Sequence, residues 1–353
     1  MSARERMLLV AAFGAVWLIW GSTYLAIAWA VESIPPVLMI GARCVLAGGV
    51  LHGWSRLRGG VRPSPADWRA AAVAGVLLFV TGQAVLAWAE TRIPSGAASL
   101  LVATEPLFIA LLPWRSGGVA AARGAFGAGV ARGGPDGLGT ILVGFAGVGV
   151  LVLPGVGGGI DPVAGAAVVL AALSWSVGVF RAGTRPGIRA GQMAGMQLLV
   201  AGGILLGLAA LIGEPGALAA TGPSLRSVGA FLYLVVLGSI VAFGAYVWLL
   251  DRVGPSRLST HAYVNPLVAV VLGTLLNGEP MGTGLLLATA LILGSVALLL
   301  RRPLPAPAAE RPGAGGESGR RIGARRGRRQ VGAWGRRRAR HPLPPPAAPP
   351  VTP

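Results

Sequence analysis

The chain has 353 residues, of which 54% are hydrophobic and 12% charged, and its mean hydropathy is +0.70. Soluble domains carry about 25% charged residues, so this composition excludes an ordinary soluble protein and indicates a membrane protein. The formal net charge of +18 comes from arginine, since the sequence contains no lysine, and the single cysteine, Cys44, excludes an intramolecular disulfide framework.

Ten apolar runs are long enough to form membrane-spanning helices, which need roughly 20 apolar residues to cross about 30 Å of hydrocarbon. The first run continues without a convincing cleavage site, so we expect a retained span and not a signal peptide. The runs cover residues 7–30, 36–54, 70–89, 97–114, 138–153, 163–180, 192–212, 228–250, 259–276 and 283–300.

After the last run, residues 301–353 are rich in proline, glycine and arginine and lack apolar periodicity. Such a segment buries too little apolar surface to fold alone, so we expect a disordered cytoplasmic tail without a nucleic-acid partner. Electrostatic binding of anionic lipid or nucleic acid to the arginines is the alternative interpretation.

The arginines outside the tail are concentrated in alternate gaps between the runs. If the N-terminus is cytoplasmic, fourteen of them fall in cytoplasmic segments and two, Arg92 and Arg226, in external ones, while Arg43 lies within a span. Cytoplasmic loops carry an excess of basic residues, so this distribution predicts that both termini are inside (N-in/C-in).

The two halves of the chain resemble each other. A displacement of 160 residues pairs WAETRIPSGAASLLVATEPLFIALL with WLLDRVGPSRLSTHAYVNPLVAVVL, and Trp88 with Trp248. A displacement of 147 residues pairs the fifth run with the tenth. Five spans per half is an odd number, so the second copy must enter the membrane from the opposite side. We therefore predict an all-α integral membrane protein of ten transmembrane helices in two inverted five-helix repeats, residues 7–153 and 162–300.

Three stretches resemble the EamA-like branch of the drug/metabolite transporter superfamily: WGSTYLAIAWAVESIPPVLMIGARCVLAGG (20–49), WAETRIPSGAASLLVATEPLFIALL (88–112) and LDRVGPSRLSTHAYVNPLVAVVLGTLLNGEP (250–280). The resemblance implies ten helices in two inverted repeats, in the bacterial inner membrane. It also implies a secondary transporter that moves small metabolites, amino-acid-like compounds or drugs, often outward. Its partners would be a small-molecule substrate and the lipid bilayer, with a coupling proton and a homodimer left open, and no cofactor is expected.

One region departs from the family pattern. Family members usually carry a Gly-Glu motif between the fourth and fifth helices, like that at Gly278–Glu279, but Val119 stands at the position matched to Glu279. The displacement also falls from 160 to 147 across this region, which leaves 13 extra residues. We interpret residues 115–137 as an atypical Gly/Arg-rich cytoplasmic segment, either a genuine insertion or a locally wrong reading frame.

Polar side chains within the spans mark the candidate site. A charged side chain at a helix centre costs about 2.5–3.5 kcal/mol on insertion scales, so such groups face the bundle interior or a wet cavity. In the matched fourth and ninth spans, Pro106 and Pro266 each remove a backbone hydrogen bond and are predicted to break the helix next to polar residues. The alternative for the two prolines is a packed kink that borders no cavity. The alternative for Arg43 is a structural role as the partner of a carboxylate or of backbone carbonyls. The candidate substrate or cavity residues are Trp20, Ser22, Thr23, Arg43, Gln83, Glu105, Trp175, Gln197, His261, Tyr263 and Asn265, with Tyr24 and Gln192 as further intramembrane polar groups.

Glu105 and His261 are the candidates for a coupling proton, because both side chains exchange protons and their protonation depends on burial. Other carboxylates fall at predicted span ends, where we expect them to be solvated: Glu32, Glu90, Asp161, Glu214, Asp251 and Glu279.

Signatures of catalysis are missing from the sequence. It contains no phosphate-binding loop and no His/Cys spacing typical of a metal site, so we predict a protein that is not an enzyme and binds no metal. A multispan membrane enzyme that acts on a lipid-linked substrate is the alternative function. Such an enzyme should gather its polar residues at one membrane face. A scaffold that recruits partners through the tail is a third hypothesis.

Overall fold

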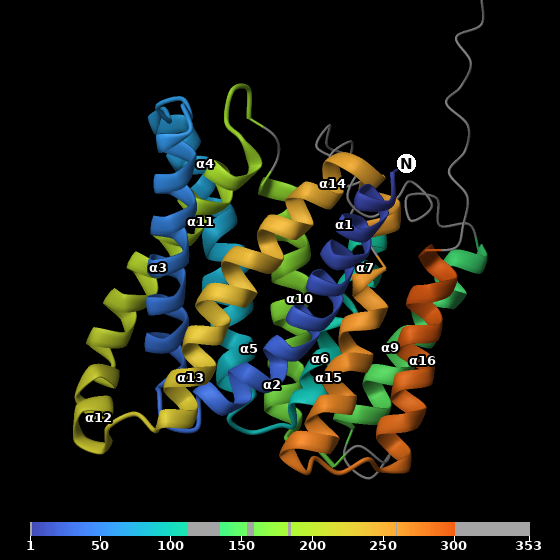
Figure 1. Ribbon diagram of the computed structural model, residues 1–353. Coiled ribbons are helices and arrows are strands. Elements are labelled where there is room, and N and C mark those ends of the chain that lie inside the picture. Colours follow the sequence, from blue (N-terminus) through green and yellow to red (C-terminus); the bar gives the residue numbers. More distant parts are fainter. Residues whose placement is uncertain (1, 112–134, 154–158, 183–184, 259, 301–353) are drawn as a thin grey trace, which may run out of the picture. The chain divides into compact units, whose positions relative to one another are not determined.

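The computed structural model describes residues 2–111, 135–153, 159–182, 185–258 and 260–300 (Figure 1). The regular structure of these residues is entirely helical, which confirms the predicted all-α class, and it belongs to one compact unit, Met1–Pro305. The tail, Val119 and most of residues 115–137 lie outside the described residues. The α-helices are α1 (Ala3–Gly14), α2 (Trp20–Ala30), α3 (Pro36–Leu57), α4 (Pro65–Gly75), α5 (Ala84–Ala89), α6 (Ser95–Val102), α7 (Glu105–Leu111), α9 (Pro135–Val152), α10 (Pro162–Ala182), α11 (Ala190–Leu211), α12 (Glu214–Thr221), α13 (Leu225–Tyr233), α14 (Ala242–Leu258), α15 (His261–Asn277) and α16 (Thr283–Leu300).

Three π-helical segments connect α-helices without a turn: η1 (Ala15–Ile19), η2 (Val76–Gln83) and η3 (Leu234–Val241). Each joins its neighbours into one long helical rod, so α1 to α2, α4 to α5 and α13 to α14 each correspond to one predicted span. Segments of π-helix are rare and occur frequently at functional sites.

Six helical rods in the described part of the chain are long and apolar enough to cross a membrane: Ala3–Ala30, Pro36–Leu57, Pro65–Ala89, Pro162–Val179, Ala190–Leu211 and Leu225–Tyr246. Four shorter apolar helices, Ser95–Ile109, Gly139–Val152, His261–Asn277 and Thr283–Leu298, coincide with the remaining predicted spans.

The helices run between two ends of the bundle (Figure 1). The start of α1 lies at the same end as the α3–α4 turn. The turns after α2, α5 and α15, together with α12, lie at the opposite end, which we call the distal end. If the N-terminus is cytoplasmic, as the arginines predict, the distal end is external.

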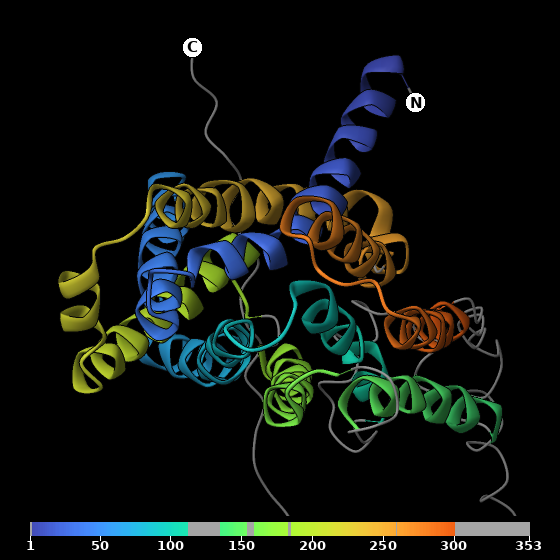
Figure 2. The same cartoon turned by 90° about the horizontal axis from the view of Figure 1, so that it is seen from below.

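The longest contact between the two halves of the chain is the antiparallel pair α3–α11, where glycines allow the backbones to approach closely. A Cβ atom at Gly195 would lie 2.6 Å from the backbone nitrogen of His52, and one at Gly202 would lie 2.8 Å from that of Val45. Such small residues are typical of packed membrane helices. A second antiparallel pair, α9–α16, lies away from α3–α11 when the bundle is seen from below (Figure 2).

The fourth predicted span, residues 97–114, is divided at Ala103–Thr104 into α6 and α7. The carbonyl of Thr104 accepts the N–H groups of Leu107 (2.9 Å) and Phe108 (3.2 Å) and so starts the new helix. Pro106 occupies the first turn of α7, where its missing N–H leaves no hydrogen bond unmade.

The break predicted at Pro266 does not occur, because α15 runs without interruption from His261 to Asn277. Pro266 lies in the second turn of this helix, so only one carbonyl, that of Ala262, loses its usual partner. The matched fourth and ninth spans therefore differ in backbone structure despite their shared proline.

Candidate functional site

The three π-helical segments place polar groups on a common internal cavity. Trp20 follows η1, Gln83 ends η2, and Ser239 lies within η3, where its hydroxyl donates to the carbonyl of Leu234 at 3.0 Å. In a π-helix the backbone bonds span five residues, and the Ser239–Leu234 bond has this spacing. The wider turns of a π-helix change the direction in which the following side chains point, compared with a regular α-helix.

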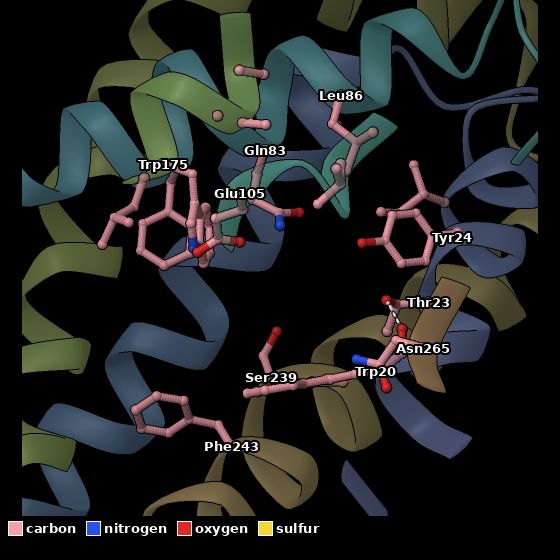
Figure 3. A pocket seen from close by; sticks show the side chains of 18 of the residues that line it. Trp20, Thr23, Tyr24, Gln83, Leu86, Glu105, Trp175, Ser239, Phe243 and Asn265 are labelled. Atoms are coloured by element: carbon pink, nitrogen blue, oxygen red, sulfur yellow. Dashed lines mark hydrogen bonds between the residues drawn. The ribbon is translucent and has the colours of Figure 1, made fainter. Parts of the chain in front are cut away.

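The cavity has a volume of about 430 Å³ and is lined by helices from both halves of the chain (Figure 3). This volume falls in the usual range for small-molecule sites, which is about 300–1,000 Å³. The cavity brings together the predicted residues Trp20, Thr23, Arg43, Gln83, Glu105, Pro106, Trp175, Gln197, His261, Asn265 and Pro266.

Two predicted site residues are not part of the lining. The hydroxyl of Ser22 lies 2.6 Å from that of Tyr233, which joins α2 to α13, and it donates to the carbonyl of Ile19 in its own helical rod at 2.9 Å. Tyr263 packs against the apolar side chains of Leu107 and Val296. Both lie next to lining residues, but the rotation of their helices turns them away from the cavity.

Glu105 is the acidic residue of the cavity lining. It opens α7 directly after the break, and its half-buried side chain faces the cavity. The indole of Trp175 lies next to its carboxylate in the cavity (Figure 3). The hydroxyl of Ser176 also donates to the backbone carbonyl of Glu105 at 3.2 Å, which fixes the broken helix against α10.

Arg43 on α3 contributes a positive charge to the same cavity. Its Nε donates to the hydroxyl of Ser239 at 2.9 Å, and this bond joins α3 to the π-helical turn of η3. A guanidinium group has five N–H donors in a fixed planar fork, so this single bond leaves donors that can bind an anionic group of a ligand.

Aromatic side chains form one wall. The indole N–H of Trp20 donates to the carbonyl of Gly238 at 3.0 Å. Its ring centroid lies 5.1 Å from that of Tyr246 and 5.5 Å from that of His261. His261 is therefore held edge-on within an aromatic cluster.

Two amide groups of the lining have unsatisfied atoms. Gln83 Oε1 and Asn265 Oδ1 are buried and make no hydrogen bond. A buried acceptor without a partner costs about 1–3 kcal/mol, so each amide is a ready position for a donor on a bound molecule. Across the cavity from Gln83 and Glu105 lie Tyr24, Thr23 and Asn265 (Figure 3).

Sequence reasoning missed the aromatic lining residues Phe79, Phe243 and Tyr246, the polar residue Ser239 and most of the apolar lining. One signal was available for Ser239. The segments η2 and η3 are both eight residues long, and a displacement of 158 residues pairs them, with Thr81 matched to Ser239. The hydroxyl of Thr81 donates to the carbonyl of Val76 with the same five-residue spacing. The displacement of 160 residues used to compare the two halves does not pair Thr81 with Ser239, so Ser239 was missed.

The carboxylates at predicted span ends behave differently from one another. Glu32 is exposed and forms an ion pair with Arg226 at 3.1 Å, as a solvated residue can. The expectation for Glu90 is wrong, because its side chain is only 7% exposed. Helix α5 ends one residue earlier and its last turn packs within the bundle, so Glu90 is covered by its neighbours. The side chain of Asp251 lies outside the described residues.

No group of three or more His, Cys, Asp or Glu side chains that could hold a metal ion occurs within residues 2–111, 135–153, 159–182, 185–258 and 260–300.

The fold, with its membrane-length apolar helices and an internal cavity that holds several polar groups, defines a membrane protein of the multi-pass α-helical class. The EamA-like transporter family matches residues 7–117 and 164–301, two segments that correspond to the two halves of the chain. The chain therefore belongs to the EamA-like transporter family and is a membrane transporter, which confirms the family inferred from its sequence.

Relatives from bacteria agree with this assignment. The chain is 35% identical over 302 residues to "Uncharacterized inner membrane transporter YedA" of Escherichia coli (strain K12), which spans 85% of this chain and 92% of that protein. The proteins of the same name from Escherichia coli O6:H1 and O157:H7 match equally. A solved structure, described as "Crystal structure of protein", is similar in fold. Its TM-score is 0.55 at 22% identity, over 83% of this chain and 98% of that chain.

Proposed function

We propose that this transporter binds a small zwitterionic molecule, an amino-acid-like metabolite or drug, in the central cavity and exports it by alternating access. The observation that carries the proposal is the presence of Arg43 and Glu105 in the lining of one cavity formed by both halves of the chain. A carboxylate of the substrate would bind Arg43, and its ammonium group would bind Glu105 with the free amide oxygens of Gln83 and Asn265. Aromatic rings would hold its apolar part.

We further propose ten spans in two inverted repeats, with both termini in the cytoplasm of a bacterial cell and the protein in its inner membrane. The six long and four shorter apolar helices support the number of spans. The equal lengths of η2 and η3 in the matched third and eighth spans support the repeat. The location is supported by the relative, which is named an inner membrane transporter.

The position of the site also favours transport over catalysis on a lipid-linked substrate. Such an enzyme should gather its polar groups at one face of the membrane. Here Gln83, Glu105 and Asn265 line a cavity between the helices.

The test is counterflow of labelled compounds in proteoliposomes that contain the purified full-length protein. The panel should include amino acids, their amides without a carboxylate, and their deaminated acids. Zwitterions should be carried in preference to both single-charge analogues. Arg43→Gln should reduce the preference for zwitterions over the amides, which lack the carboxylate. Glu105→Gln should reduce the preference for zwitterions over the deaminated acids, which lack the ammonium group. Glu32→Gln is the charge-matched control, because Glu32 is exposed at the distal end, and it should leave the preference unchanged. Absence of flux for the whole panel with folded protein would contradict the proposal.

The coupling ion requires a separate measurement. We propose a proton, with Glu105 and His261 as the cavity groups that exchange it. Transport driven by a pH gradient should be lost in Glu105→Gln or His261→Ala while counterflow, which needs no gradient, continues. If gradient-driven transport persists in both variants, Glu105 and His261 are not the groups that exchange the coupling proton.

A further inference from the structure

Two turns at the distal end share the sequence Gly-Glu-Pro: Gly213–Glu214–Pro215 after α11, and Gly278–Glu279–Pro280 after α15. Both glycines have positive φ, +81° at Gly213 and +63° at Gly278. This left-handed conformation ends each helix at little cost only for glycine, and it turns the following glutamate back toward the bundle.

Each glutamate binds the N-terminus of a helix in the first half of the chain. Glu214 accepts the N–H groups of Val37 (3.4 Å) and Leu38 (2.6 Å) at the start of α3. Glu279 accepts the N–H groups of Ser95 and Gly96, both at 2.9 Å, and the hydroxyl of Ser95 at 2.7 Å, at the start of α6. A carboxylate is favoured there by the free N–H groups and by the positive end of the helix dipole. We call these two sets of bonds the Glu214 tie and the Glu279 tie.

Alternating access requires the distal end to open, and both ties hold that end closed because each connects the second half of the chain to the first. The Glu279 tie is tightly enclosed. A Cβ atom at Gly273 would lie 2.5 Å from Oε2 of Glu279, and one at Gly96 would lie 3.4 Å from the same oxygen. The carboxylate therefore has little room to move while α6 and α15 remain packed together.

A second carboxyl group, that of Glu90, lies within electrostatic range of Glu279. Glu90 is 7% exposed, and both of its carboxyl oxygens are buried without a hydrogen-bond partner. The backbone of Ala28 in α2 faces the same carboxyl group but makes no hydrogen bond of ordinary geometry with it. An unpaired buried anion costs several kcal/mol, so the neutral acid is the stable form in this closed arrangement.

The charged groups around Glu90 do not compensate its charge. Arg92, two residues further on, lies over the ring of Trp88 and 3.9 Å from Asp161. Tyr24 on α2 lies within electrostatic range, and among the described residues the charge that acts on Glu90 is that of Glu279. Glu90 follows the last residue of its membrane-spanning helix. Burial, and to a lesser extent the negative charge of Glu279, raises the pKa of Glu90 well above its ordinary value.

The position of Tyr24 connects this turn to the cavity. Tyr24 lines the cavity, and it is within electrostatic range of both Glu105 and Glu90. The cavity carboxyl group of Glu105 and the distal carboxyl group of Glu90 therefore both act on the same side chain, although they lie in different segments of the chain.

We propose that Glu90 is a proton-binding site that controls the Glu279 tie, so that proton binding closes the distal end and proton loss opens it. This inference rests on the proposed function, for which it names a second coupling-ion site outside the cavity. With a proton on Glu90, the anionic Glu279 remains bound to α6. When the proton leaves to water, Glu90 and Glu279 are two negative charges within electrostatic range of each other, and their repulsion favours separation and hydration as the tie breaks.

The direction of the pH effect follows from the raised pKa of Glu90. The closed state binds this proton more tightly than the open, hydrated state does. Closure is therefore fully favoured below the ordinary pKa of glutamate and is lost as the pH rises through the raised value. The Glu214 tie has no described buried carboxyl partner of this kind and serves as an internal control.

Cys44 provides a native reporter of opening. It is the single cysteine of the sequence, it lines the cavity, and it is only 1% exposed. The full-length protein in sealed right-side-out membrane vesicles is treated with a membrane-impermeant maleimide over a range of pH. Labelling of Cys44 at each pH is normalised to the denatured protein, which removes the pH dependence of the thiol reaction itself. No substrate is present, so the result does not depend on whether transport is detected.

The labelling rate of the wild type should rise with pH. Glu90→Gln should show the low rate of the closed state at every pH, whereas Glu90→Asp, which still titrates, should retain a pH response. Glu279→Gln should raise the rate about tenfold at low pH, as expected for losing hydrogen bonds to a charged acceptor. Glu214→Gln should also raise the rate but should keep the pH dependence.

A wild-type rate that does not change with pH, or an unchanged pH dependence in Glu90→Gln, would overturn the proposal. So would a low, closed-state rate in Glu279→Gln. If Glu90→Gln removes the pH dependence of Cys44 labelling only in inside-out vesicles, the result would support the proton site and contradict the proposed orientation. Gel filtration of each variant in detergent verifies that it is folded.

Discussion

The two Gly-Glu-Pro turns have the same sequence, the same left-handed glycine and the same task, yet they differ in their surroundings. Glu214 binds α3, whose whole length is packed on α11 through glycines, so its tie reinforces a contact that is already extensive. Glu279 binds α6, a short helix that ends at the break before Glu105, and it lies within electrostatic range of the buried Glu90. The comparison shows that a motif specifies a local cap, while its neighbours decide whether that cap can respond to pH.

The largest expected effect follows from removing both ties. In Glu214→Gln/Glu279→Gln, labelling of Cys44 from the distal side should rise about a hundredfold over the wild type, since the two sites are separate and their effects should add in free energy. The measurement is the maleimide labelling rate in right-side-out vesicles at low pH. A double variant no faster than Glu279→Gln alone would mean that the Glu214 tie does not contribute to closure.

The packing of α3 on α11 is tested by Gly195→Ala. The added Cβ would meet the backbone of His52 at 2.6 Å, so the helices must separate, and the free energy of unfolding should fall by about 1–3 kcal/mol. Thermal unfolding in detergent measures this change. Gly203→Ala on the same helix is the matched control, because nothing lies within 4 Å of the added atom. Equal stability of the two variants would show that the α3–α11 contact tolerates expansion.

The shared backbone of the two turns is tested by Gly213→Ala and Gly278→Ala. Neither position has an atom within 4 Å of an added Cβ, so the cost comes from the positive φ alone, roughly 1–2 kcal/mol at each site. The two variants should therefore lower thermal stability equally, and Gly282→Ala, which has open space and no positive φ, should not lower it. A large difference between the two turns would show that one of them relaxes.

The smallest effect is expected from the exposed ion pair at the distal end. Glu32 lies 3.1 Å from Arg226, and both side chains are more than two-fifths exposed. Exposed pairs contribute about 0–1 kcal/mol, so Glu32→Gln should barely change Cys44 labelling at any pH. A change as large as that of Glu279→Gln would show that distal closure depends on general charge and not on the two ties.

Much of the fold was predictable because hydrophobic length and arginine placement are local properties of the sequence. The apolar runs correspond to helical rods, and the all-α class and the family were inferred correctly. Nearly all of the candidate polar residues line the cavity, since a polar group within an apolar span has few other places to go. Ser22 and Tyr263 lie elsewhere because a small rotation of a helix decides which of two neighbouring residues faces inward.

The break in the fourth span and the continuity of the ninth show where local reasoning fails. Both spans carry a proline, but Pro106 begins a new helix after Thr104, whereas Pro266 lies inside an unbroken one. Pro266 leaves the carbonyl of Ala262 without its usual partner, whereas Pro106 lies in the first turn of α7, where no bond within the helix is lost. The surrounding contacts, such as the bond from Ser176 to the carbonyl of Glu105, differ between the two.

By itself, the sequence determined that this protein folds in a membrane, its approximate spans, most of the candidate cavity residues and the Gly-Glu motif at Gly278–Glu279. Each of these depends on composition, periodicity or backbone freedom within a few residues. Only the tertiary structure decided that Glu90 is buried and that Glu279 binds Ser95, which lies 184 positions away along the chain. The physical reason is that burial and partnership of a charge depend on which helices meet around it, and that meeting is a property of the assembled bundle.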